Sequence, residues 1–308
     1  MPETTGMPRE FSPEKMLEAN RRQREAWAIQ ETKGQRFPIP REGKTLAGVE
    51  KESVNTILYR PQQPMDKKLP VLFNMHGGAW IGGDAVLMES FCQMMADELP
   101  ALVVNVNYRK ADEKPFPYAM EEVADAVCWM TDHAEEYGID PMKMAVGGHS
   151  AGAQLAAGTS LMLKERGVKL AAQMLVYPAV DLSAKEGLMG LVGQLLFPEG
   201  CNPEYNGSHP WASPLLASDE ELSGVAPAIF VECGPDDLRP QGIAYAKRLI
   251  DLGVPVTLRE FAKAEHGFLE VNRSDYPDGD PRKTPEQAEY ARECEKYLVG
   301  ALKMIFGI

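Results

Sequence analysis

Short apolar runs alternate with helical patterns along most of this chain, and this alternation restricts its fold more than any other feature. The runs LPVLFNM, ALVVNVNY, MKMAVGG, AAQMLVYPAV, APAIFVEC and VPVTLREF are typical of buried strands. Between most of them stand helical patterns such as AMEEVADAVCWMTDHAEEYG and GAQLAAGTSLMLKER. Because parallel strands need crossover helices, the pattern predicts an α/β protein with a mostly parallel sheet and helices on both faces.

Two segments interrupt the alternation. The first is a charged helical pattern with Ser12 as the expected N-cap and Pro13 at the first helical position, running to about Glu31 before the Pro-rich stretch FPIPREG. The second, residues 183–212, contains no convincing strand but many leucines, valines and methionines. We expect both to pack over the carboxyl edge of the sheet. The expected division is an N-terminal cap helix and linker at 1–45, a core at 46–182 and 213–308, and an inserted cap segment at 183–212.

Edge strands are expected in TLAGVEKESVNTILYRP, and TPEQAEYARECEKYLVGALKMIF predicts a final helix that starts at a Thr-Pro pair. No apolar run approaches the ~18–20 residues of a membrane helix, and the first residues lack a secretory pattern. A net charge of −13 argues against nucleic acids and anionic membranes as partners. We therefore expect a cytoplasmic protein with no stable membrane association, in which a homodimer is possible.

The chain has five cysteines in 308 residues, widely spaced and without a C-x-x-C or Cys/His cluster. An odd number at such spacings is typical of reduced, buried thiols in a cytosolic protein. The sequence therefore predicts neither a disulfide framework nor a metal site.

Residues 147–158 read GGHSAGAQLAAG, with Ser150 between Gly148 and Gly152 in the pattern G-x-S-x-G. An apolar strand pattern precedes Ser150 and a helical pattern follows it, which is the setting of a nucleophile elbow. The same letters also suit an ordinary glycine-bounded turn in which Ser150 caps the helix. This stretch alone leaves both interpretations open.

Acyl transfer by a serine also needs backbone donors for the oxyanion, a base, and a group that orients the base. The sequence HGGAW follows the strand LPVLFNM, and its adjacent Gly77 and Gly78 allow the backbone to turn N–H groups toward one point. Gly78 and Ala79 are candidate donors, and Ala151 is a third. A Gly-Gly pair after a strand is otherwise a simple turn.

Of the histidines, His266 is the predicted base, because it lies in the polar loop EFAKAEHGF after a strand. His149 precedes Ser150 directly, and successive side chains diverge at an elbow, so we do not expect it to reach the hydroxyl as a base. The acid should follow a strand between Ser150 and the base, where GPDDLRP offers both Asp236 and Asp237. The chain order Ser, Asp, His is that of the α/β-hydrolase fold.

The motifs HGGAW, NYRKADEKPFPYAMEEV, GHSAG, WASPLLA, GPDDLRPQG and AEHGF, in this order, resemble the hormone-sensitive-lipase-like (bacterial family IV) carboxylesterases over roughly residues 70–270. The resemblance implies an α/β-hydrolase fold with a two-part helical cap and no cofactor. It implies Ser150, Asp236 and His266 as catalytic residues, with Gly78, Ala79 and Ala151 as oxyanion donors. It also implies that His76 orders the oxyanion loop. Tyr108, Arg109 and Glu113 are expected to tie the neighbouring loop. His149 stands where the family more often has an acid.

The predicted function is a serine carboxylesterase acting on small esters of short acyl chains, from acetyl to butyryl. Trp80 follows the oxyanion turn and is expected to narrow the acyl side of the pocket, unless it only packs under the cap. Trp80 and His149 are the predicted substrate contacts. The alternatives are a deacetylase of acetylated sugars, an arylformamidase-type amide hydrolase, and a small-molecule binder without activity.

Overall fold

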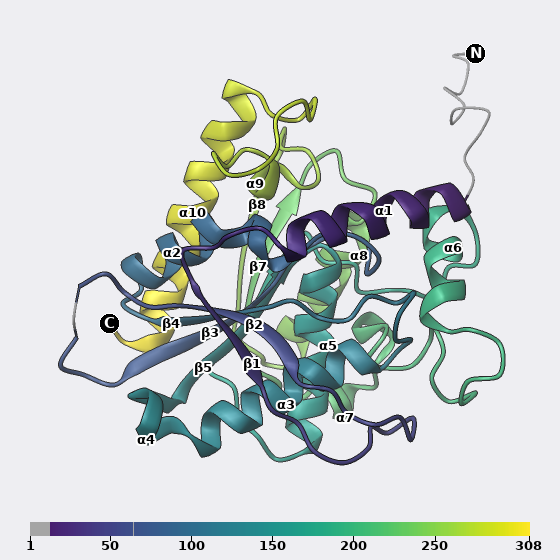
Figure 1. Ribbon diagram of the computed structural model, residues 1–308, viewed down its shortest axis with the longest axis horizontal. Helices are drawn as coiled ribbons and strands as arrows, with labels where there is room; N and C mark the ends of the chain where they lie inside the picture. The colour runs from purple at the N-terminus through teal and green to yellow at the C-terminus, as the bar shows by residue number, and fades with distance from the viewer. Residues whose placement is uncertain (1–12, 64) are drawn as a thin grey trace.

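Eight strands form one sheet in the order β1-β2-β4-β3-β5-β6-β7-β8 within residues 13–63 and 65–308, which the computed structural model describes (Figure 1). Strands β1 and β2 run antiparallel to their neighbours, and all other pairs are parallel. The strands are β1 (Gln35–Ile39), β2 (Val54–Tyr59), β3 (Leu69–Met75), β4 (Leu102–Val106), β5 (Ile139–His149), β6 (Ala172–Val176), β7 (Ala228–Cys233) and β8 (Val256–Phe261).

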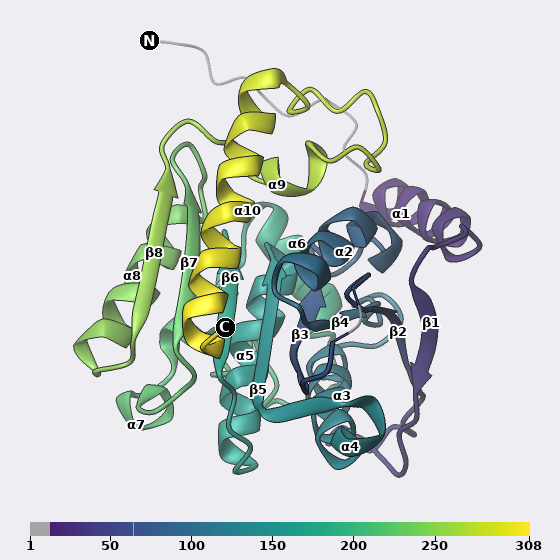
Figure 2. The same ribbon diagram turned by 90° about the vertical axis from the view of Figure 1, so that its left-hand side faces the viewer.

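Helices cover both faces of the sheet, as predicted. One apolar cluster packs α3, α5 and α8 against side chains such as Phe73 of β3. The other packs α2 and α10 against the opposite face, which includes the neighbouring Leu72, and Figure 2 shows α10 beside β6 and β7. The helices are α1 (Pro13–Ala28), α2 (Glu89–Glu98), α3 (Tyr118–Asp132), α4 (Ala134–Tyr137), α5 (Ala151–Glu165), α6 (Gly187–Leu196), α7 (Asp219–Leu222), α8 (Arg239–Asp251), α9 (Phe268–Val271) and α10 (Pro285–Phe306), with short 3-10 turns at Ala85–Met88 and Pro214–Leu216.

The N-terminal quarter differs from the prediction in three places. The stretch predicted as a Pro-rich bridge overlaps β1, in which Pro38 pairs with Asn55 of β2. Proline is tolerated there because β1 is an edge strand, where a missing N–H leaves no ladder bond unmade. The expected edge strands in TLAGVEKESVNTILYRP reduce to β2, and helix α1 ends at Ala28. The expected N-cap Ser12 lies outside the described residues.

The loops that follow the parallel strands meet at one edge of the sheet, and α1 lies across this edge (Figure 1). Helix α6, within residues 183–212, reaches the same edge, because Met189 of α6 and Met16 of α1 line one cavity there. In the part of the chain that the structure describes, no helix is both long enough and apolar enough to cross a membrane.

Candidate active site

A sharp turn presents Ser150 between strand β5 and helix α5. Its backbone has φ 53° and ψ −115°, a strained conformation for a residue with a side chain. A β-carbon on Gly148 would stand 2.4 Å from the carbonyl oxygen of Gly152, and one on Gly152 would stand 2.3 Å from the carbonyl oxygen of Met75. Both glycines are therefore required by close packing, which is the geometry of a nucleophile elbow.

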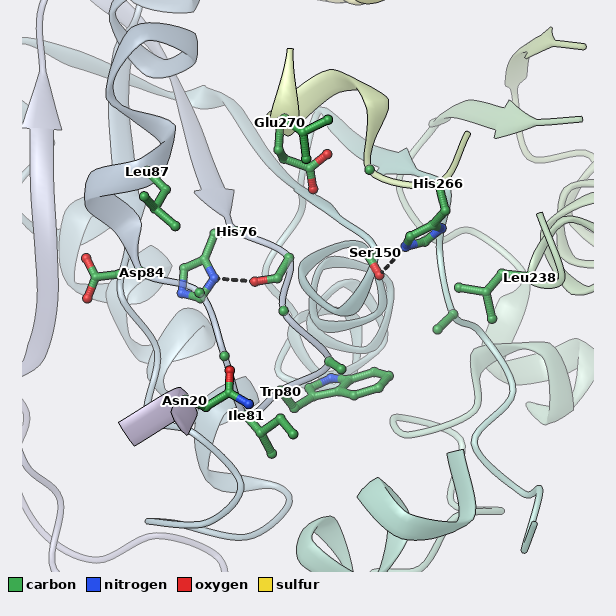
Figure 3. A pocket seen from close by; sticks show the side chains of 18 of the residues that line it. Asn20, His76, Trp80, Ile81, Asp84, Leu87, Ser150, Leu238, His266 and Glu270 are labelled. Carbon is green, nitrogen blue, oxygen red and sulfur yellow. Dashed lines mark hydrogen bonds between the residues drawn. The ribbon is translucent and has the colours of Figure 1, made fainter. Parts of the chain in front are cut away.

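Ser150, His266 and Asp236 form a continuous hydrogen-bonded chain. The Nε2 atom of His266 lies 2.8 Å from the Oγ atom of Ser150 (Figure 3), and its Nδ1 atom lies 2.6 Å from Oδ2 of Asp236. The side chain of His266 is 34% exposed and faces the cavity, whereas that of Asp236 is only 5% exposed. A carboxylate at Nδ1 holds the proton on that nitrogen, which leaves Nε2 free to accept the serine proton.

The two candidate acids differ in their surroundings. Asp236 also accepts a hydrogen bond from the backbone N–H of Leu238 at 2.9 Å, so both of its oxygens are engaged. Asp237 is exposed at the cavity rim. The geometry thus brings Asp236, and not Asp237, into contact with the histidine.

The loop after β3 turns its backbone toward the serine. Gly78 has φ 124° and Ala79 has φ 50°, so the chain reverses within these residues. A β-carbon on Gly77 would stand 3.6 Å from Cβ of Ser150, which places this loop beside the nucleophile. Within the described residues, no hydrogen bond uses the N–H groups of Gly78, Ala79 or Ala151. Unused donors next to a candidate nucleophile are what an oxyanion hole requires.

His76 holds this loop from behind. Its Nδ1 donates to the carbonyl oxygen of Gly77 at 2.6 Å, and its Nε2 accepts from Nζ of Lys110 at 3.1 Å. Burial and the nearby Lys110 charge lower the pKa of His76 well below its usual value, so the imidazole is neutral and fits one donor and one acceptor role. The hydroxyl of Tyr108 donates to the carbonyl oxygen of His76 at 3.0 Å, and the two rings stack.

Arg109 and Glu113 bind elsewhere than the oxyanion turn. Arg109 pairs with the buried Glu122 of α3 at 2.6 Å, and Glu113 pairs with Arg24 of α1 at 3.2 Å. Of the three residues expected to tie the loop beside the oxyanion turn, Tyr108 contacts the oxyanion turn itself. The other two join the loop that holds them to helices α3 and α1.

Trp80 lines the cavity below Ser150 (Figure 3), although only 3% of the residue is exposed. Its Nε1 donates to Oε1 of Gln154 at 2.9 Å, and the amide of Gln154 donates in turn to the carbonyl oxygens of Trp211 and Ala212. The indole is therefore fixed between helix α5 and the end of the inserted segment. Trp80 thus packs into the core and also lines the cavity, and its effect on acyl chain length stays a prediction.

His149 does not line the cavity, so the prediction that it contacts substrate is wrong. Its side chain has no exposed surface, and neither ring nitrogen has a hydrogen-bond partner within the described residues. Its ring packs edge-on against Phe91, and burial together with the charge of Arg273 lowers its pKa to about 3. The elbow turns this side chain away from the serine into the apolar layer under the sheet.

The cavity has a volume of about 750 Å³ and runs from Ser150 toward α1, α6 and α9. The sequence analysis did not predict several residues that line this cavity, including Asn20 and Gln23 of α1, Tyr276, and Glu270 of α9. None of these residues had a local sequence signal. His266 precedes the N-cap of α9, so helical spacing does not relate it to Glu270. The position of the α1 residues depends on how that helix docks.

Known proteins resemble this chain in sequence and in structure. Residues 72–270 match the family model of the α/β hydrolase fold. The carboxylic ester hydrolase LipN of Mycobacterium tuberculosis is 35% identical over 223 residues, covering 66% of this chain but only 58% of that protein. The arylesterase of Saccharolobus solfataricus is 36% identical over 213 residues, covering 65% of this chain and 68% of that one. An esterase of Pyrobaculum calidifontis, in its monoclinic form, has a TM-score of 0.77 at 26% identity, covering 98% of this chain and 95% of that one.

The family match spans more than half of the chain, and the whole fold follows that of a solved esterase. The predicted resemblance and the predicted fold are both confirmed. On this evidence the chain belongs to the hormone-sensitive-lipase-like carboxylesterases of the α/β-hydrolase superfamily.

Proposed function

We propose that this protein is a serine carboxylesterase that hydrolyses esters of short acyl chains, from acetyl to butyryl, through an acyl-enzyme. The observation that carries the proposal is the hydrogen-bonded chain from Ser150 through His266 to Asp236, beside backbone N–H groups that have no acceptor among the described residues. This combination of nucleophile, base, orienting acid and donors is the one that acyl transfer requires.

In the first half of the reaction, the Oγ atom of Ser150 attacks the ester carbonyl carbon while Nε2 of His266 takes its proton. The carbonyl oxygen becomes an oxyanion that accepts hydrogen bonds from the N–H groups of Gly78, Ala79 and Ala151. The imidazolium then gives its proton to the departing alkoxide, and the acyl group remains on Ser150.

In the second half, a water molecule attacks the acyl-enzyme and His266 takes the proton of this water. Collapse of the second tetrahedral intermediate releases the carboxylic acid and returns the proton to Ser150. Asp236 keeps the Nδ1 proton in place in both halves and stabilises the imidazolium. No step calls for a cofactor.

The fixed position of Trp80 supports the short acyl preference. Its indole closes the cavity below the nucleophile, and the bond to Gln154 restrains it from swinging aside. Each methylene buried in an apolar groove contributes roughly 0.8 kcal/mol, so a groove of acyl length would favour longer chains. A closed wall instead forces additional methylenes to clash or to remain in water.

We further propose that α1 and residues 183–212 act together as a cap over the active site. Residues of α1 (Met16, Asn20) and of the inserted segment (Ala184, Met189) line the same cavity as Ser150. Arg24 of α1 pairs with Asp112 at 2.9 Å, which attaches the helix to the loop beside the oxyanion turn.

The test is the hydrolysis of acetyl, butyryl and octanoyl nitrophenyl esters beside acetylated xylo-oligosaccharides. We expect kcat/KM to be highest for acetyl or butyryl esters. A higher value for octanoate would contradict the acyl preference, and faster deacetylation of the oligosaccharides would make the protein a carbohydrate deacetylase.

A further inference from the structure

Glu270 is an acidic side chain on the wall of the active-site cavity, and the proposed mechanism gives it no role. It lies on α9, and its side chain is only 12% exposed. Its Oε2 accepts a hydrogen bond from the hydroxyl of Tyr177. Its Oε1 makes no hydrogen bond within the described residues, and the carboxylate points toward the cavity (Figure 3).

The free oxygen of Glu270 lies close to the nucleophile. The point where a β-carbon of Gly77 would stand is 3.0 Å from Oε1 of Glu270 and 3.6 Å from Cβ of Ser150. The carboxylate and the serine therefore flank the same small space. A group attached near the scissile ester bond of a bound substrate falls within reach of this oxygen.

The charges around the cavity favour a cation at this position. Among the described residues that line it, five are acidic: Asp84, Glu186, Asp236, Asp237 and Glu270. Arg282 is the only lysine or arginine among them, and its guanidinium is already paired with Asp280 and bonded to the carbonyl oxygen of His266. The described lining therefore carries more acidic than basic side chains, which favours a positively charged group.

We propose that Glu270 selects esters that carry a protonated amine close to the scissile bond, an inference that rests on the proposed role of Ser150 as the nucleophile. Tyr177 holds one carboxyl oxygen, so the other is oriented before substrate binds. A hydrogen bond between an ammonium and a carboxylate is about twice as strong as one between neutral groups, and it strengthens further where water is excluded.

The electrostatics of Glu270 agree with this role. Burial raises its pKa to about 7, while its own backbone N–H and, to a smaller extent, the charge of Arg282 oppose the shift. His149 lies 3.9 Å away from Oε2, but its own low pKa keeps it neutral. A carboxyl group with a raised pKa lacks a fixed cationic partner, and an ammonium on the substrate would supply one and keep the carboxylate ionised.

Isosteric ester pairs isolate the effect of the charge. On the alcohol side, 2-(dimethylamino)ethyl acetate is compared with 3-methylbutyl acetate; on the acyl side, the ethyl ester of N,N-dimethylglycine is compared with ethyl 3-methylbutanoate. Each pair replaces a protonated nitrogen by carbon at nearly constant shape. The measured quantity is the ratio of kcat/KM for the amine ester to kcat/KM for its carbon analogue. A substitution that slows both reactions equally leaves this ratio unchanged.

We expect the wild-type enzyme to favour the amine by at least about tenfold in one of the two pairs, the range of a charge-assisted hydrogen bond. Glu270→Gln should bring this ratio down to about one or below, because the variant keeps the size of the side chain and removes its charge. The matched control is Glu265→Gln, which removes an exposed carboxylate next to His266 but outside the cavity lining and should keep the wild-type ratio.

Three outcomes overturn the inference: no preference for either amine in the wild type, a preference that survives Glu270→Gln, or an equal loss in Glu265→Gln. Calorimetric binding of the same pairs to Ser150→Ala separates this inference from the proposed function. Selective amine binding without turnover in the wild type would contradict only the esterase role, whereas turnover without selective binding would contradict only the role of Glu270.

Discussion

Nε1 of Trp80 donates a 2.9 Å hydrogen bond to Oε1 of Gln154, which joins the residue after the oxyanion turn to the helix that follows the nucleophile. Gln154 is almost fully buried and also binds the backbone of the inserted segment. One amide thus holds the cavity wall and the insertion in a fixed relation to Ser150. The acyl preference is expected to depend on this contact.

Trp80→Ala should therefore shift the acyl preference toward longer chains. Removing the indole opens space below the nucleophile that octanoyl methylenes can occupy, each contributing roughly 0.8 kcal/mol. We expect the ratio of octanoate to acetate kcat/KM to rise at least about tenfold. Gln154→Met, which removes the bond but keeps the bulk, should produce a smaller shift in the same direction. If kcat/KM depends on acyl length in Trp80→Ala as it does in the wild type, the indole does not determine the acyl preference.

Ser150→Ala and His266→Ala should each lower kcat by several orders of magnitude. The two side chains act as one unit, and single losses in the best-studied serine hydrolase reach ~10⁶. Both variants should retain the wild-type circular dichroism spectrum and melting temperature within a few degrees, because neither removes a core side chain. A purified variant that keeps more than about a tenth of the wild-type rate would refute the assignment.

Asp236→Asn should be far more damaging than Asp237→Asn. Asparagine at position 236 favours the wrong imidazole tautomer, an effect of about 10⁴ on kcat in a related triad. Asp237 is exposed, so its replacement should leave kcat within about threefold. Steady-state kinetics of the two variants side by side provide the test, and equal losses would mean that the acid is wrongly assigned.

His149→Gln should keep most of the wild-type kcat, in contrast to His266→Ala. The ring of His149 is buried against Phe91, and its pKa of about 3 rules it out as a base near neutral pH. Stability is expected to fall by about 1 kcal/mol, because glutamine loses the edge-on ring contact with Phe91. Urea unfolding measures this loss. A variant as inactive as His266→Ala would contradict the elbow geometry.

Glu232→Gln should stabilise the protein around pH 7. Neither carboxyl oxygen of Glu232 has a hydrogen-bond partner within the described residues, and burial, with a smaller effect of the Asp236 charge, raises its pKa to about 9. The folded state therefore binds a proton that the unfolded state, with a glutamate pKa of about 4.3, releases. The contribution of Glu232 to the free energy of unfolding is therefore greatest below about pH 4, and it falls as the pH rises from about 4 to 9.

By pH 7 the wild type has lost about 4 kcal/mol of stability through this group, and the glutamine variant does not lose it. We expect Glu232→Gln to be more stable than the wild type at pH 7 and equally stable near pH 4, as measured by denaturant unfolding at both values. Glu289→Gln on the exposed face of α10 is the control and should change little at either pH. Equal stability of wild type and Glu232→Gln at pH 7 would contradict the raised pKa.

The sequence by itself determined the class of fold and predicted Ser150 as the candidate nucleophile. Strand and helix patterns are periodic within about ten residues, and the elbow around Ser150 depends on glycines two residues away on either side, so both are visible locally. The order of the motifs along the chain carried the family resemblance. The resemblance in turn favoured Asp236 over Asp237, a choice that the residues alone left open.

The tertiary structure decided what depends on distant residues meeting. His266 and Ser150 are 116 positions apart, and Trp80 and Gln154 are 74 apart, so no local pattern reports their contacts. The edge position that admits Pro38 into β1 likewise follows from strand pairing. Whether His149 faces the substrate or the core, and whether Glu270 keeps a free oxygen at the cavity, depends on packing between separate elements, which local periodicity does not encode.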